Sequence, residues 1–165
     1  MEMMHTQHTK HILLTVIALM LSIIMGGCAS LGKLSVSELR LESVSPMGFR
    51  AMSVTACAWV ENPSNEIVFS DLRGVIYFEG KTIGTVVAEP VAVSSGYSGR
   101  MSVRAQMQLD RNVTAVDVLR IVATPDILNK CTVDIHGKAK QKRKAAFVVN
   151  RKGVPLNRFL GMIRR

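Results

Sequence analysis

One cysteine of the sequence lies where its thiol could be chemically modified. Cys28 comes directly after Gly26 and Gly27, at the end of an uncharged apolar run formed by residues 12–25. Lys10 provides a basic flank in front of this run. A short apolar run between a basic flank and small residues is typical of a secretory signal that is removed from the mature protein. The sequence therefore predicts export, with Cys28 at the cleavage site.

The segment Met25-Gly26-Gly27-Cys28 resembles the lipobox of bacterial lipoproteins, although that family prefers leucine at the position of Met25. The resemblance implies a diacylglycerol with chains such as palmitate on the Cys28 thiol, cleavage before this residue and acylation of the new amino group. Several acyl chains hold a protein firmly, because each buried methylene contributes about 0.8 kcal/mol. The alternative is an uncleaved signal anchor, although the apolar run is shorter than the about 20 residues that span a bilayer.

These patterns divide the chain into a signal peptide, residues 1–27, and a short lipidated tether, residues 28–33. A β domain is predicted for residues 34–150, followed by a basic amphipathic segment, residues 151–165. Ala29 stands where lipoproteins retained in the inner membrane of enteric bacteria carry aspartate. That resemblance implies a place in the outer membrane, facing the periplasm.

Residue patterns for catalysis are missing from the sequence. Once the signal is removed, His136 is the only histidine, and no motif pairs it with a nucleophile. The segment Gly80-Lys81-Thr82 is similar to the end of a phosphate-binding loop, but that loop requires a glycine where this chain has Val75. No spacing of Cys, His or acidic residues is typical of a metal site. We therefore expect no catalytic residues, no cofactor and no metal.

Two further cysteines, Cys57 and Cys131, lie on separate predicted strands. An envelope compartment permits a disulfide between them. Two buried free thiols are the alternative, since cysteine is among the residues most often buried. The sequence leaves the choice open.

Basic residues are concentrated toward the C-terminus. Of 21 Lys and Arg, residues 138–165 hold ten, and this range contains none of the 12 Asp and Glu. Such a segment is a candidate contact for anionic lipid or another envelope polyanion, formed by Lys138, Lys140, Lys142, Arg143 and Lys144. A solvated basic hairpin that keeps the protein soluble is the alternative. Nucleic acid is not expected as a partner, because an exported protein rarely meets it and no aromatic residues are interleaved with the basic ones.

The elements that position these residues are mainly strands. Residues 52–60 and 101–109 have an apolar residue at every second position, the period of a half-buried strand. Further strands are predicted at residues 36–44, 75–78, 82–93, 131–135 and 145–149. About seven strands with turn signals between them predict an antiparallel β-sandwich.

Helical patterns are few. Residues 114–122 are predicted as a short helix, because Thr114 and Asp117 have the spacing of a capping box. Ile127 is expected to add a further turn, and residues 157–165 could form a short terminal helix.

A set of turns and strands resembles a known family. The strand 52–60 runs into the turn Asn62-Pro63-Ser64-Asn65, and the hairpin 75–84 follows with Gly80 at its turn and Gly84 after Ile83. Together they resemble the late embryogenesis abundant type 2 domain, also called the water-stress and hypersensitive-response domain, over about residues 34–150. The departure is Ser64, where the family often has asparagine.

This resemblance implies an immunoglobulin- or fibronectin-like sandwich of about seven strands, no enzymatic activity, and a role in desiccation and other stress responses. We therefore expect a non-enzymatic, lipid-anchored envelope protein whose β-sandwich binds or shields an envelope component. The alternative is a structural adaptor that recruits a protein partner through contacts at a sheet edge.

Overall fold

The structure, a computed structural model, describes residues 33–157, apart from the side chains of Leu39, Leu41, Val122 and Leu128. The predicted signal peptide, Cys28 and the end of the basic C-terminal segment lie outside this range. Eight strands and two short helices make up the described chain: β1 (Ser35–Pro46), β2 (Ala51–Asn62), β3 (Ile67–Phe78), β4 (Lys81–Ala88), β5 (Val91–Val93), β6 (Tyr97–Leu109), α2 (Ala115–Ala123), α3 (Ile127–Lys130), β7 (Cys131–Gln141) and β8 (Phe147–Pro155).

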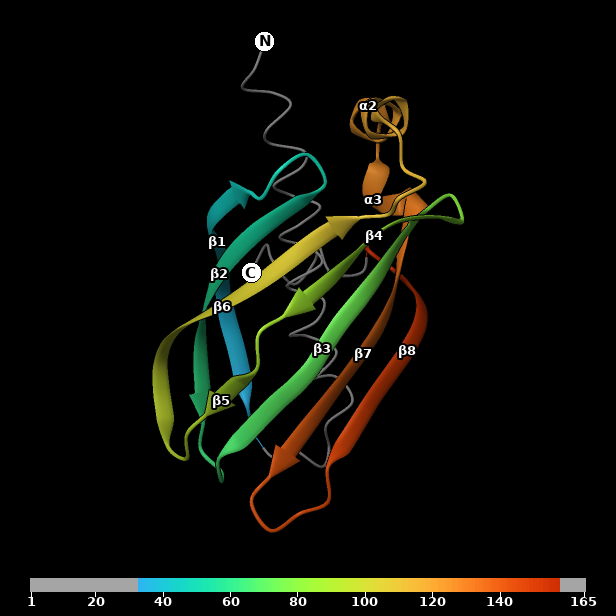
Figure 1. Cartoon of the computed structure of the whole chain (residues 1–165). Helices are drawn as coiled ribbons and strands as arrows, with labels where there is room; N and C mark the ends of the chain where they lie inside the picture. Colours follow the sequence, from blue (N-terminus) through green and yellow to red (C-terminus); the bar gives the residue numbers. More distant parts are fainter. Residues whose placement is uncertain (1–32, 158–165) are drawn as a thin grey trace.

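The strands form one antiparallel sheet in the order β1-β2-β6-β4-β3-β7-β8, and β5 also pairs with β3. Figure 1 shows that this sheet curls into an open half-barrel. The prediction of a mainly antiparallel β domain with little helix is therefore confirmed. Within the described chain, β1 and β8 each pair with a single neighbouring strand.

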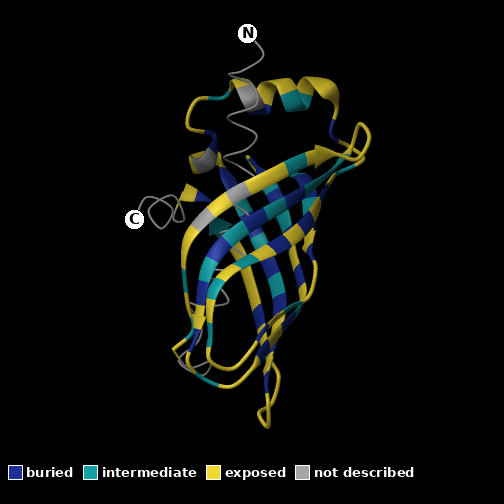
Figure 2. Cartoon of the chain, turned by 90° about the vertical axis from the view of Figure 1, so that its left-hand side faces the viewer, coloured by how far each residue is buried: buried dark blue, intermediate teal, exposed yellow. Residues whose placement is uncertain are grey.

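The inner face of the curled sheet carries the core. In β2 the alternating residues Val54, Ala56, Ala58 and Val60 are all buried, as the strand period predicts. The second predicted alternation, in β6, buries its inner residues in the same way from residue 103 to residue 107. Buried and exposed residues alternate along the strands in Figure 2. Each valine removed from water in this way contributes about 1.5–3 kcal/mol to folding.

Three predicted boundaries differ from the structure. The expected strand 82–93 is divided into β4 and β5 at Pro90, because proline cannot donate a hydrogen bond to the ladder. The predicted strand 101–109 begins four residues earlier, at Tyr97, as β6. The last strand extends beyond the predicted Val149 to Pro155, which pairs with Thr132 on β7. Residues 151–155 therefore belong to the domain rather than to a separate C-terminal segment.

The two ends of the half-barrel differ in what they carry. Ser35, the first residue of β1, pairs with Glu61 near the end of β2, and Ile67 at the start of β3 pairs with Gln141 at the end of β7. The start of β1, the β2–β3 turn and the β7–β8 turn therefore share one end, which we call the lower end after its place in Figure 1. The upper end carries the β1–β2 turn, α2 and α3.

The helix α2 begins with the predicted capping box. The Thr114 hydroxyl oxygen accepts from the backbone N–H of Asp117 at 3.2 Å, and the Asp117 carboxylate accepts from the Thr114 backbone N–H at 2.8 Å. The Lys81 ammonium lies 2.9 Å from the same carboxylate. The Thr114 backbone N–H, the Lys81 ammonium and the Thr114 hydroxyl all favour the charged form, so the pKa of Asp117 lies well below its ordinary value.

Thr114→Ala is expected to lower the free energy of unfolding by about 1 kcal/mol, the usual cost of losing an N-cap side chain.

Because the pKa of Asp117 is lower in the folded state, this carboxylate stabilises the fold above its unfolded pKa and loses that effect as the pH falls. Asp117→Asn should therefore weaken the fold at pH 7 and weaken it less at pH 3. Urea unfolding at both pH values measures this difference, and an equal effect at both would contradict the assignment.

Candidate functional site

The predicted turn Asn62-Pro63-Ser64-Asn65 lies at the lower end, and its first residue is the centre of a hydrogen-bond network. Asn62 is fully buried, with a relative exposure of 0%. Its amide nitrogen Nδ2 donates to the carbonyl oxygens of Asn65, Val93 and Ser94 at 3.0–3.1 Å. Asn62 therefore connects the β2–β3 turn to the turn that follows β5.

Ser64, the third residue of the turn, completes this network. Its backbone N–H and its hydroxyl both donate to Oδ1 of Asn62, at 3.1 and 2.9 Å. The Ser64 hydroxyl oxygen also accepts from Nε2 of Gln141, which is buried at the end of β7. Ser64 therefore stabilises the turn through its two hydrogen bonds to Asn62 and links the turn to Gln141, at the end of β7. The sequence analysis did not single out Gln141. The one pattern that indicates it is its place in β7, where this polar residue continues the series of buried positions.

The two glycines of the predicted motif have different structural roles. Gly80, with Glu79, forms the β3–β4 turn, and both have positive φ angles, 82° and 48°. Gly84 is buried in β4, where a Cβ atom would lie 2.5 Å from the backbone oxygen of Gln108. Both glycines therefore serve the fold rather than a chemical step.

The five predicted polyanion contacts are exposed residues of one hairpin. Lys138 already has a partner, since its ammonium lies 2.7 Å from the Asp71 carboxylate. The Lys138 ammonium lowers the pKa of Asp71 below its ordinary value, mainly through their hydrogen bond. Lys140, Lys142, Arg143 and Lys144 enter no ion pair within the described part of the chain.

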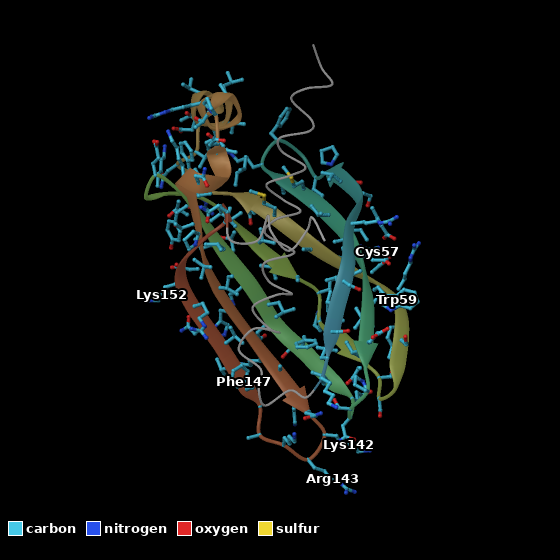
Figure 3. The ribbon with its side chains drawn as sticks, turned by 180° about the vertical axis from the view of Figure 1, so that it is seen from behind. Cys57, Trp59, Lys142, Arg143, Phe147 and Lys152 are labelled. Atoms are coloured by element: carbon cyan, nitrogen blue, oxygen red, sulfur yellow. The ribbon has the colours of Figure 1, made fainter. Side chains whose placement is uncertain are left out.

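We call Lys142, Arg143 and Lys144 the basic hairpin tip. The turn closes with a hydrogen bond from the Lys144 backbone N–H to the Gln141 carbonyl at 3.0 Å. Arg143 has a φ of 64°, in the left-handed region. Lys142 and Arg143 project from the bottom of the molecule in Figure 3.

The described residues of the basic C-terminal range are spread along β7 and β8 rather than gathered in one place. Lys152 lies part-way up β8 in Figure 3, away from the basic hairpin tip. The end of β8 reaches the upper end, where the Asn157 amide donates to the Asn129 side-chain oxygen at 2.9 Å. The predicted terminal helix, beyond Asn157, lies outside the described residues.

The two cysteines of the domain are not paired with each other. Cys57 lies on β2 and is partly exposed, as Figure 3 shows, whereas Cys131 is buried at the start of β7. Three strands, β6, β4 and β3, separate β2 from β7 in the sheet order. Burial raises the pKa of the Cys131 thiol to about 11. The structure therefore favours free thiols, the alternative that the sequence left open.

Two cavities differ in whether charged residues line them. An apolar cavity between β1, β2, β6 and β5 has a volume of about 20 Å³, enough for about one water molecule. A cleft of about 130 Å³ lies beside α2, and its lining combines three apolar residues with four charged ones: Phe78, Ile83, Ile121, Glu79, Lys81, Asp117 and Arg120. In this cleft the charges already pair, with Lys81 2.9 Å from Asp117 and Arg120 3.3 Å from Glu79. Neither cavity therefore presents an unsatisfied charged group to a ligand.

Residues 33–157 contain neither a metal-type cluster of side chains nor a membrane-spanning helix. No three His, Cys, Asp or Glu side chains lie close enough together there to hold a metal ion. No described helix has the length and apolar character needed to cross a membrane.

No protein-family model and no curated protein matches the sequence. Three solved structures show limited similarity. A protein from Archaeoglobus fulgidus has a TM-score of 0.43 and 16% identity, with 71% of this chain and 94% of that chain covered. A β-glucuronidase from glycoside hydrolase family 2 has a TM-score of 0.32 and 11% identity over 70% of this chain and 11% of that chain. MHC-like MILL2 has a TM-score of 0.22 and 13% identity over 73% and 41% of the two chains. All three scores are low, so the comparisons assign neither a family nor a function.

Proposed function

We propose that the protein is a non-enzymatic lipoprotein of the bacterial cell envelope, anchored through lipid on Cys28. The observation that carries this proposal is the placement of Cys28 between a short apolar run and a β domain that begins at Ser35, seven positions later. A signal that ends in a cysteine close to a folded domain suits a lipid anchor with a short tether. The proposed location is the outer membrane, with the domain facing the periplasm.

The finer fold that we propose is an immunoglobulin- or fibronectin-like sandwich. β6 pairs with β4 only from Ala105 to Leu109, whereas its pairing with β2 continues to Tyr97. Toward the lower end the sheet therefore divides into one part with β1, β2 and β6 and another with β5, β3, β7 and β8. Two such parts facing each other across the core correspond to the layers of a sandwich.

The proposed activity is to bind or shield an envelope component, as the resemblance to the late embryogenesis abundant type 2 domain implies. Support comes from the network around Asn62, which gives the Asn-Pro turn a structural reason, and from the close packing at Gly84. These are the positions on which the resemblance depends. The role in water stress and desiccation rests on the same resemblance.

Lipid attachment is tested by growing bacteria that express the full chain with labelled palmitate. We expect the wild-type protein to carry the label and to be found in the membrane fraction. The Cys57→Ser protein, the matched cysteine control, should behave in the same way. Cys28→Ser should lose the label and keep residues 1–27, which mass spectrometry detects. An unlabelled wild-type protein that retains residues 1–27 would instead indicate an uncleaved signal anchor.

A second candidate function is an adaptor that binds a protein partner by adding a strand to the sheet. It is favoured by the single pairing of β1 and β8 within the described chain, because an edge strand offers free backbone donors and acceptors. Proline substitutions in β8 would remove such binding, whereas neutralising the basic hairpin tip would leave it unchanged.

A further inference from the structure

The basic hairpin tip is a concentrated positive charge at the lower end of the domain. Its three side chains and that of Lys140 are exposed and without an ion pair in the described chain. The acidic residues nearest to this end along the strands are Glu61 and Glu66, both exposed and also outside any ion pair there. Positive charge thus exceeds negative charge where β7 turns into β8.

Apolar side chains lie on the outer face of the sheet at this hairpin, one on β8 and one on the neighbouring strand β3. Val68 pairs with Lys140 and Val148 pairs with Lys138, so each valine shares a face with a lysine. Val68 is 37% exposed and Val148 is 51% exposed. Apolar and basic side chains on one surface suit the interface of an anionic membrane, where the charges meet head groups and the methyl groups leave water. A soluble polyanion would use the charges alone.

The lower end is also where the chain continues toward Cys28. Lys33 lies five positions after Cys28, so a fully extended tether reaches at most about 18 Å. Attachment at this distance keeps the hairpin close to the surface and gives a weak contact a high effective concentration. An anchor on the opposite end would instead hold the hairpin away from the membrane.

We propose that the basic hairpin tip binds anionic phospholipid head groups of the membrane that holds Cys28, as a second contact that orients the domain. This inference rests on the lipid anchor proposed above. The lower end then faces the bilayer, and the upper end, with the exposed side chains of Met47 and Phe49 in the β1–β2 turn, points away from it.

The test uses the full lipid-anchored protein in two kinds of vesicle, phosphatidylcholine alone and phosphatidylcholine with phosphatidylglycerol. An environment-sensitive fluorophore is attached through Ala146→Cys beside the hairpin tip, in a Cys57→Ser background where Cys131 stays buried. A second protein carries the fluorophore through Val116→Cys on α2, at the upper end. Flotation with the vesicles reports the anchor, and quenching by acrylamide reports exposure of each fluorophore.

We expect anionic vesicles to protect the probe at position 146 and to leave the probe at position 116 fully quenched. Raising the salt to about 1 M should abolish the protection, since the screening length falls from about 8 Å to about 3 Å. The variant Lys142→Gln/Arg143→Asn/Lys144→Gln should also lose it, with asparagine chosen because it tolerates a positive φ. Removing three charges elsewhere, with Arg111→Gln/Arg151→Gln/Lys152→Gln, should preserve the protection.

The two proposals fail in different ways in this experiment. A protein that does not float with vesicles lacks the anchor, and that result overturns both proposals. A protein that floats but shows equal quenching at position 146 in both kinds of vesicle overturns the hairpin contact alone. Protection that survives in the hairpin variant, or that is lost equally in the matched control, also overturns it.

Discussion

Asn62→Ala is expected to lower the free energy of unfolding by about 3 kcal/mol, because it leaves several buried polar groups without partners. The two hydrogens of the Asn62 amide nitrogen are shared among three carbonyl oxygens, and its Oδ1 accepts two hydrogen bonds from Ser64. The bond to the Val93 carbonyl is fully buried, so water cannot simply replace the amide. The loss should also loosen the turn that precedes β6, whose Gly96 N–H donates to the Asn62 carbonyl at 2.8 Å.

At neutral pH, Asn62→Asp should lower the free energy of unfolding more than Asn62→Ala does, and the size of its effect should depend on pH. A carboxylate at this position would face the three carbonyl oxygens that now receive hydrogen bonds from Nδ2. Burial and these oxygens favour the protonated acid, so its pKa in the folded state should exceed its unfolded value of about 3.9. The folded state then binds the proton more tightly, and the stability of this variant should fall relative to wild type as the pH rises above about 4.

Urea unfolding followed by the fluorescence of Trp59, the single tryptophan of the chain, measures both effects. Asn65→Ala is the matched control, because Asn65 is exposed and contributes its backbone carbonyl rather than its side chain to the network. Its effect should stay within about 0.5 kcal/mol of wild type. Equal stabilities of the Asn62→Ala and Asn65→Ala proteins would show that the network does not stabilise the fold.

Local patterns predicted much of this fold because their physical causes are local. The alternation in β2, the turn at Gly80 and the capping box at Thr114 each depend on residues a few positions apart, and the structure contains all three. The capping box, for example, needs only two side chains and two backbone N–H groups that lie three residues apart.

The arrangement of the sheet depends on pairings between distant residues, which the sequence alone does not indicate. The basic residues of the C-terminal range follow one another closely in the sequence, yet those that the structure describes are spread out, because β8 carries Arg151 and Lys152 from the lower end toward the upper end. The shared position of Ser35 and the basic hairpin tip follows from pairings of β1 with β2 and of β3 with β7. The candidate residues could therefore be named from the sequence, but their position relative to the anchor could not.

Gly84→Ala should destabilise the protein strongly, by about 3 kcal/mol, because the added methyl group has no space. Gly84 is buried in β4 and pairs with Ile76 on β3 and with Leu109 on β6. A Cβ atom there would lie 2.5 Å from the backbone oxygen of Gln108 and 3.3 Å from the Cα atom of Leu109. Backbone atoms of a paired strand cannot move aside as the end of a flexible side chain can, so β4 and β6 would have to separate.

The position of Gly84 makes this separation costly for the whole sheet. β4 and β6 pair over five positions, from Gly84 to Ala88, and in the sheet order this ladder alone joins β1, β2 and β6 to the remaining strands. Alanine variants of two other glycines, measured by urea unfolding, distinguish a steric clash from an unfavourable φ as the cause of a loss of stability. Gly99→Ala, on β6, meets its nearest atom at 3.4 Å and should have little effect, whereas Gly80→Ala has open space but a φ of 82° and should cost about 1 kcal/mol. If Gly84→Ala proved as mild as Gly99→Ala, the two strands would not approach closely here, and the link between the two parts of the sheet would be looser than the structure shows.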